Sequence, residues 1–178
     1  MLYFINDNIS MITLIWLFPV IFMLHDFEEI IFVESWFKKN YYKVRPRVPA
    51  SMLKTFEKMS TVTSARFSIP VLFQLVIYIP GCYLAAEQNM YGMFIGFTVL
   101  FFLHLFMHIG QSVFLNMYAL GTGTSLLVLP YFIYLFYRLF SEDILVFSDL
   151  LFSLPFGLLQ AAALFGGHAI APKILSEK

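Results

Sequence analysis

Five long apolar stretches dominate this chain of 178 residues. A helix needs about 20 mostly apolar residues to cross the hydrocarbon core of a bilayer. Only 12% of the residues are charged and the mean hydropathy is +0.80, whereas about a quarter of the residues in soluble domains are charged. The sequence therefore predicts an all-α fold, a polytopic transmembrane helix bundle with about five spans that forms a single domain over residues 1–178. The expected spans are 9–37, 63–86, 91–118, 124–140 and 144–170.

The positive charges are concentrated in one connection between spans. Eight of the eleven Lys and Arg residues lie between Lys38 and Arg66, although the formal net charge is zero. The positive-inside rule makes this basic loop, at about 38–62, cytoplasmic. Five spans then put the N-terminus outside and the C-terminus inside. Within the loop, residues 50–59 have an amphipathic pattern typical of a helix on the membrane surface. The loop could also hold anionic lipid headgroups.

The first span contains an unusual group of ionisable residues. His25, Glu28 and Glu29 are spaced i, i+3 and i+4, which places them on one face of a helix, while Asp26 points away from that face. Buried carboxylates cost several kcal/mol each unless they are paired, protonated or bound to a metal ion. Two adjacent glutamates in a membrane-length segment therefore indicate a functional site.

Histidines in two further spans are candidates for the same site. His104 and His108 are spaced i, i+4 in the third span, followed by Gln111, and His168 lies in the fifth. The first, third and fifth spans run in the same direction, and their ionisable residues all fall in the cytoplasmic half. We therefore expect these side chains to meet at one depth. A lone intramembrane histidine can instead form a helix–helix hydrogen bond, and this alternative is strongest for His168.

The residue types predict a metal site without sulfur ligands. Two histidines at i, i+4 on a helix can bind one ion, and Cys82 is the only cysteine. Nitrogen and carboxylate ligands suit a divalent metal such as zinc, with iron or manganese as alternatives. Glu29 is the predicted catalytic acid or base, although Glu28 and Glu29 are interchangeable at this stage. The predicted metal ligands are His25, Glu28, His104, His108 and His168.

The motif from His25 to Glu29 resembles the signature of the HXXEE domain family of small integral membrane proteins. That family is also described by a second histidine, which His108 matches, with His104 as the other candidate. A Tyr-x-Pro-Gly motif completes the description. A literal copy stands at Tyr78–Gly81, but Tyr118–Gly121, downstream of the second histidine and with leucine in place of proline, is the alternative. The resemblance implies a shared intramembrane site without naming a reaction.

Three functions remain open at this point. The preferred hypothesis is a metal-dependent hydrolase or transferase that acts on a lipid or lipid-linked substrate from the cytoplasmic side of the cell membrane. The second is a metal-independent His/Glu acid–base enzyme, an isomerase or a relative of the glutamate intramembrane proteases of the prenyl-endopeptidase type. Their Glu-Glu-x-x-x-Arg pattern is absent, because Val33 stands in the arginine position. The third is a metal or proton carrier or a ligand-binding membrane protein. Nucleic-acid binding is not expected.

Overall fold

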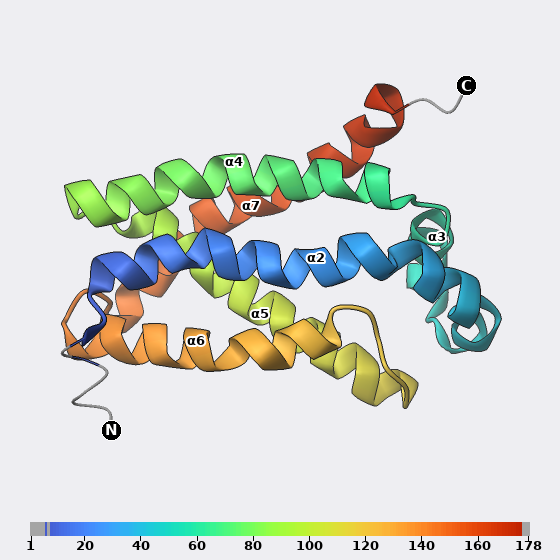
Figure 1. Ribbon diagram of the computed structural model, residues 1–178, viewed down its shortest axis with the longest axis horizontal. Helices are drawn as coiled ribbons and strands as arrows, with labels where there is room; N and C mark the ends of the chain where they lie inside the picture. Colours follow the sequence, from blue (N-terminus) through green and yellow to red (C-terminus); the bar gives the residue numbers. More distant parts are fainter. Residues whose placement is uncertain (1–5, 7, 176–178) are drawn as a thin grey trace.

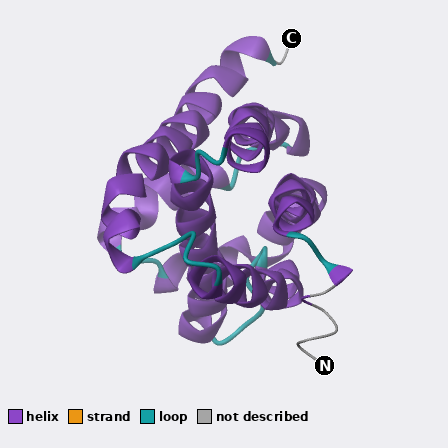
Figure 2. Ribbon diagram, turned by 90° about the vertical axis from the view of Figure 1, so that its left-hand side faces the viewer, coloured by secondary structure: helices purple, strands orange, loops and turns teal. Residues whose placement is uncertain are grey.

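The computed structural model describes residue 6 and residues 8–175, and these residues form helices and short connections without a strand (Figure 2). Five helices are long and apolar enough to cross a membrane, which confirms the all-α fold with five candidate spans and indicates an integral membrane protein. The orientation of the termini stays a prediction. The elements are α2 (Met11–Val44), the 3₁₀ turn η1 (Arg45–Arg47), α3 (Ala50–Met59), α4 (Ser64–Gln88), α5 (Gly92–Leu115), α6 (Thr122–Ser141) and α7 (Phe147–Ile174).

The five long helices enclose a common interior (Figure 1). Each packs on the next in the order α2, α4, α7, α5 and α6, and α6 returns to α2. The interior is aromatic. Tyr78 of α4 has no exposed surface and contacts Phe18 and Phe22 of α2, with ring centroids 4.9 and 4.7 Å apart. Tilted and edge-on aromatic pairs of this kind contribute about 0.5–1.5 kcal/mol each beyond their buried area. This aromatic core fixes how α2 and α4 pack on each other.

The first helix is longer than the sequence analysis expected, because it continues beyond Phe37 to Val44. It ends at the Arg45-Pro46-Arg47 turn, since Pro46 has no backbone N–H to extend the helical hydrogen bonds. The third long helix is shorter than expected and ends at Leu115. Asn116 follows in the left-handed conformation, with φ of 48°. The chain then turns back toward the interior before α6 begins.

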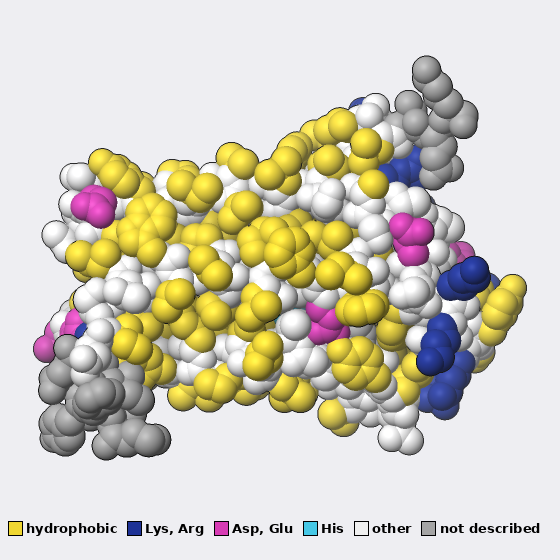
Figure 3. All heavy atoms as spheres, in the orientation of Figure 1, with side chains coloured by type: hydrophobic (Ala, Val, Ile, Leu, Met, Phe, Trp, Pro, Cys, Tyr) yellow, Lys and Arg dark blue, Asp and Glu magenta, His cyan; other side chains and the backbone are white. Residues whose placement is uncertain are grey.

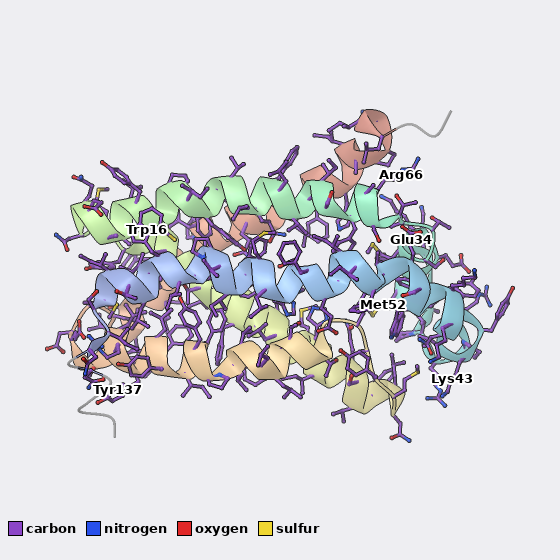
Figure 4. The ribbon with its side chains drawn as sticks, viewed as in Figure 1. Trp16, Glu34, Lys43, Met52, Arg66 and Tyr137 are labelled. Atoms are coloured by element: carbon purple, nitrogen blue, oxygen red, sulfur yellow. The ribbon has the colours of Figure 1, made fainter. Side chains whose placement is uncertain are left out.

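The surface matches a protein that crosses a bilayer. Apolar side chains cover the middle of the face shown in Figure 3, whereas Lys and Arg gather at the end where α3 lies. Lys43 and Met52, labelled in Figure 4, lie at that basic end, and Trp16 and Tyr137 lie toward the opposite end. Such an asymmetric distribution of positive charge is the basis of the predicted cytoplasmic side.

Candidate metal centre

Four side chains from two helices converge at one point in the interior. His25 and Glu29 come from α2, and His104 and His108 come from α5. One potential ligand atom from each residue lies within 4.8 Å of all the others. The spacing along each helix explains the arrangement, since residues four apart project from the same face. We call these four residues the His/Glu group.

The distances within the group are close to those of a metal site. The Nε2 atom of His108 lies 2.8 Å from Nε2 of His104 and 3.2 Å from Oε1 of Glu29. The ring of His25 has its centroid 5.0 Å from that of His108. Tetrahedral zinc with bonds of about 2.0–2.1 Å separates its ligand atoms by roughly 3.3 Å. Small side-chain adjustments would therefore let the three histidines bind one divalent ion with Glu29 beside it.

The orientation of His25 also favours an ion. Its Nε2 atom is buried and has no hydrogen-bond partner among the described residues, while Nδ1 lies 3.1 Å from the hydroxyl of Thr124. That hydroxyl in turn donates to Oε2 of Glu28 at 2.6 Å. With its proton on Nδ1, His25 donates to Thr124 and presents the Nε2 lone pair to the group. Imidazole ligands are commonly oriented through their second nitrogen in this way.

Glu28 lies outside the His/Glu group and binds the start of α6. Its carboxylate accepts hydrogen bonds from the backbone N–H of Gly121 at 3.0 Å and of Thr124 at 2.7 Å, as well as from the Tyr118 hydroxyl. Negative charge is favourable at a helix N-terminus, where backbone N–H groups have no partner within the helix. The structure thus brings Glu29, rather than Glu28, together with the three histidines. A metal-ligand role for Glu28 stays a prediction without support from this geometry.

The loop between α5 and α6 completes the site. Tyr118 donates to Glu28, and both burial and this bond raise the pKa of Tyr118 above its usual value. Gly121 has a φ of +81°, and a Cβ atom there would lie 2.7 Å from Nδ1 of His108. Only glycine fits this position without strain. Of the two candidate Tyr/Gly motifs, Tyr118–Gly121 therefore lies at the site, whereas Tyr78 lies in the aromatic core.

Comparison with known families identifies the family of this chain. The model of a family described as "Protein of unknown function with HXXEE motif" matches residues 16–135. The chain belongs to the HXXEE family. The matched segment contains the motif from His25 to Glu29, both histidines of α5 and the Tyr118–Gly121 loop. No curated protein and no solved structure shows significant similarity.

His168 does not join the His/Glu group of this HXXEE protein. It lies on α7 and packs edge-on against Phe67 of α4, with ring centroids 5.7 Å apart. The predicted role of His168 as a metal ligand stays a prediction. In the structure its ring packs against Phe67. His168 does line the same cavity as His104 and His108.

The sequence analysis missed the role of Thr124, which lies beside the HXXEE motif, and the burial of Asp26 within the motif. Thr124 connects Glu28 to His25, but a threonine at the start of a span carries no distinctive signal in the sequence. Asp26 is only 4% exposed, although it points away from the His25–Glu29 face, and its Oδ2 atom has no hydrogen-bond partner among the described residues. The signal that could have indicated the burial of Asp26 is its position within the motif, next to three other ionisable residues.

Proposed function

We propose that this HXXEE protein is a membrane-embedded, metal-dependent enzyme, a hydrolase or transferase that acts on a lipid or lipid-linked substrate from the cytoplasmic side of the plasma membrane. The observation that carries the proposal is the convergence of His25, His104, His108 and Glu29 within 4.8 Å in the interior of a helix bundle. Zinc fits this set of nitrogen and oxygen atoms, and iron or manganese are alternatives.

The roles of the residues follow from their positions. Three histidines are a common ligand set for catalytic zinc, which keeps one coordination position open. A metal ion bound there would supply a Lewis acid and activate a water molecule. Glu29 has Oε1 only 3.2 Å from His108 and is the candidate general acid or base. Glu28 holds the α6 N-terminus and, through Thr124, the orientation of His25, so it is a positioning residue.

A measurement of lipid turnover tests this function. The purified protein would be incubated in vesicles of a total membrane lipid extract, and the products would be identified by mass spectrometry. We expect turnover that stops on metal removal and returns on addition of zinc. Glu29→Gln should lower it about 10²- to 10⁴-fold, the usual contribution of a general acid or base. Glu34→Gln is the matched control, because Glu34 instead accepts a hydrogen bond from the backbone of Ser64. Equal turnover in both variants would contradict the proposal.

A second candidate is an acid–base enzyme without a metal. The contacts of His108 with His104 at 2.8 Å and with Glu29 at 3.2 Å would also allow these groups to share and transfer a proton. Such a chain suits isomerisation or hydrolysis of an apolar substrate. Turnover that survives exhaustive chelation but is lost in Glu29→Gln would favour this candidate over the metalloenzyme.

A further inference from the structure

The helices α5 and α7 separate next to the His/Glu group. Near their first turns they are in close contact, since a Cβ atom on Gly96 would lie 2.4 Å from the backbone oxygen of Ser153. Farther along, α7 packs on α4 instead, where a Cβ atom on Gly167 would lie 2.4 Å from Cα of Pro70. In Figure 1 the last part of α7 leaves the bundle beyond this contact. The two helices therefore diverge toward the end of the molecule that carries α3.

A cavity of about 560 Å³ fills the space between the diverging helices. Such a volume is in the usual range for small-molecule sites. His104, His108 and Glu29 line one part of it, and α3 lines another part through Met52 and Phe56. The walls also include residues of α2, α4, α5 and α7, among them Val33, Phe37, Phe67, Phe114 and Leu164.

The chemistry of the lining selects an apolar occupant. None of the described lining residues is Lys or Arg, and Glu29 is the one carboxylate in the lining. The nearby η1 and α3 do carry positive charges, on Arg45, Arg47, Lys54 and Lys58. An anionic headgroup would find no Lys or Arg partner along these walls, and desolvation of its charge would be costly. A hydrocarbon chain would bury apolar surface, at about 25 cal/mol per Å².

The cavity also reaches the outer surface of α5 and α7. Phe114 of α5 is 67% exposed and lines the cavity, and Leu164 of α7 is half-buried on the opposite wall. Both residues belong to helices that are long and apolar enough to cross the membrane. In a membrane, the gap between α5 and α7 would face the acyl chains of the bilayer, which makes a lipid chain the molecule best placed to enter.

We propose that this cavity binds one fatty acyl chain of a membrane lipid, which enters between α5 and α7 and places its polar end toward Glu29, His104 and His108. This inference names the substrate class of the proposed enzyme and rests on that function for the role of the His/Glu group. Chain binding itself requires only the apolar walls. The two proposals can therefore fail separately.

Photo-crosslinking tests the inference on the full-length protein in detergent. The probe is methyl palmitate with a diazirine in its chain, a neutral ester, used with metal-loaded and with metal-stripped protein. We expect labelling in both samples, on peptides that contain cavity residues of α3, α5 and α7. Leu164→Trp should fill the cavity and lower labelling at least about tenfold, which corresponds to about 1.4 kcal/mol of binding free energy. Leu158→Trp, on the same helix but 71% exposed and outside the cavity, should leave labelling unchanged.

The positions of the crosslinks in the wild-type protein decide the test even if Leu164→Trp does not fold. Labels confined to exposed residues of α7 such as Leu151 or Phe152 would overturn the inference. Competition by geranylgeraniol but not by unlabelled methyl palmitate would overturn the assignment to an acyl chain. Cavity labelling of a protein that binds no metal would contradict the proposed metalloenzyme but support acyl-chain binding. Metal binding without cavity labelling would do the reverse.

Discussion

The backbone N–H of Thr124 donates to the carboxylate of Glu28 at 2.7 Å, and the hydroxyl of the same threonine lies 3.1 Å from Nδ1 of His25. One residue at the start of α6 thus connects two residues of the HXXEE motif on α2. The connection explains why the motif contains two glutamates with different surroundings. Glu28 orients His25 through Thr124, whereas Glu29 lies beside the histidines.

Thr124→Val should weaken metal binding without removing a ligand. The valine keeps the backbone N–H that binds Glu28 but loses the hydroxyl that orients His25. Removal of such an outer partner typically lowers metal affinity about 10- to 100-fold. Isothermal titration of metal-stripped protein with zinc measures the change. Thr13→Val, an exposed threonine near the start of α2, is the control and should bind zinc like the wild type.

The four histidines should differ in their effect on metal content. We expect purified protein to contain about one divalent ion per chain, measured by inductively coupled plasma mass spectrometry. His104→Ala should lose the ion, because this residue belongs to the His/Glu group. His168→Ala should retain it, since His168 packs against Phe67 outside the group. Loss of the ion in His168→Ala would restore this residue as a ligand, and a metal-free wild-type protein would contradict the proposed centre.

Gly121→Ala and Gly110→Ala should change stability in opposite directions. Gly121 has a φ of +81°, and its Cβ would lie 2.7 Å from His108, so alanine should cost about 1–3 kcal/mol of unfolding free energy. A Cβ on Gly110 meets nothing within 4 Å, and alanine is favoured over glycine within a helix by about 0.5–1 kcal/mol. Thermal unfolding in detergent compares both variants with the wild type. An unchanged midpoint for Gly121→Ala would show that the loop can relax.

Cysteine labelling should reveal the orientation in the membrane. In a Cys82→Ser background, Glu87→Cys at the end of α4 should react with a membrane-impermeant maleimide in intact cells. Lys54→Cys on α3 should react only after lysis, because the basic segment is expected on the cytoplasmic side. Both positions are exposed, so accessibility within the protein does not limit the reaction. The opposite labelling pattern would reverse the predicted topology.

Much of the fold could be predicted because it depends on local properties of the chain. Long apolar stretches indicated the five spans, and the amphipathic pattern indicated a helix over residues 50–59, the same residues that α3 covers. The predicted positions of the helix ends were less accurate. The left-handed conformation of Asn116, which ends α5, depends on how the following loop folds back.

The sequence by itself determined that His25, Glu28 and Glu29 share a face, and that His104 and His108 share another, because helical periodicity sets the direction of each side chain. Only the tertiary structure decided that Glu29 joins the histidines while Glu28 binds Thr124 and Gly121. Adjacent residues on a helix differ in direction by about 100°, so the rotation of α2 against α5 and α6 chooses between them. That rotation depends on side-chain packing across the whole interior, which no local pattern specifies.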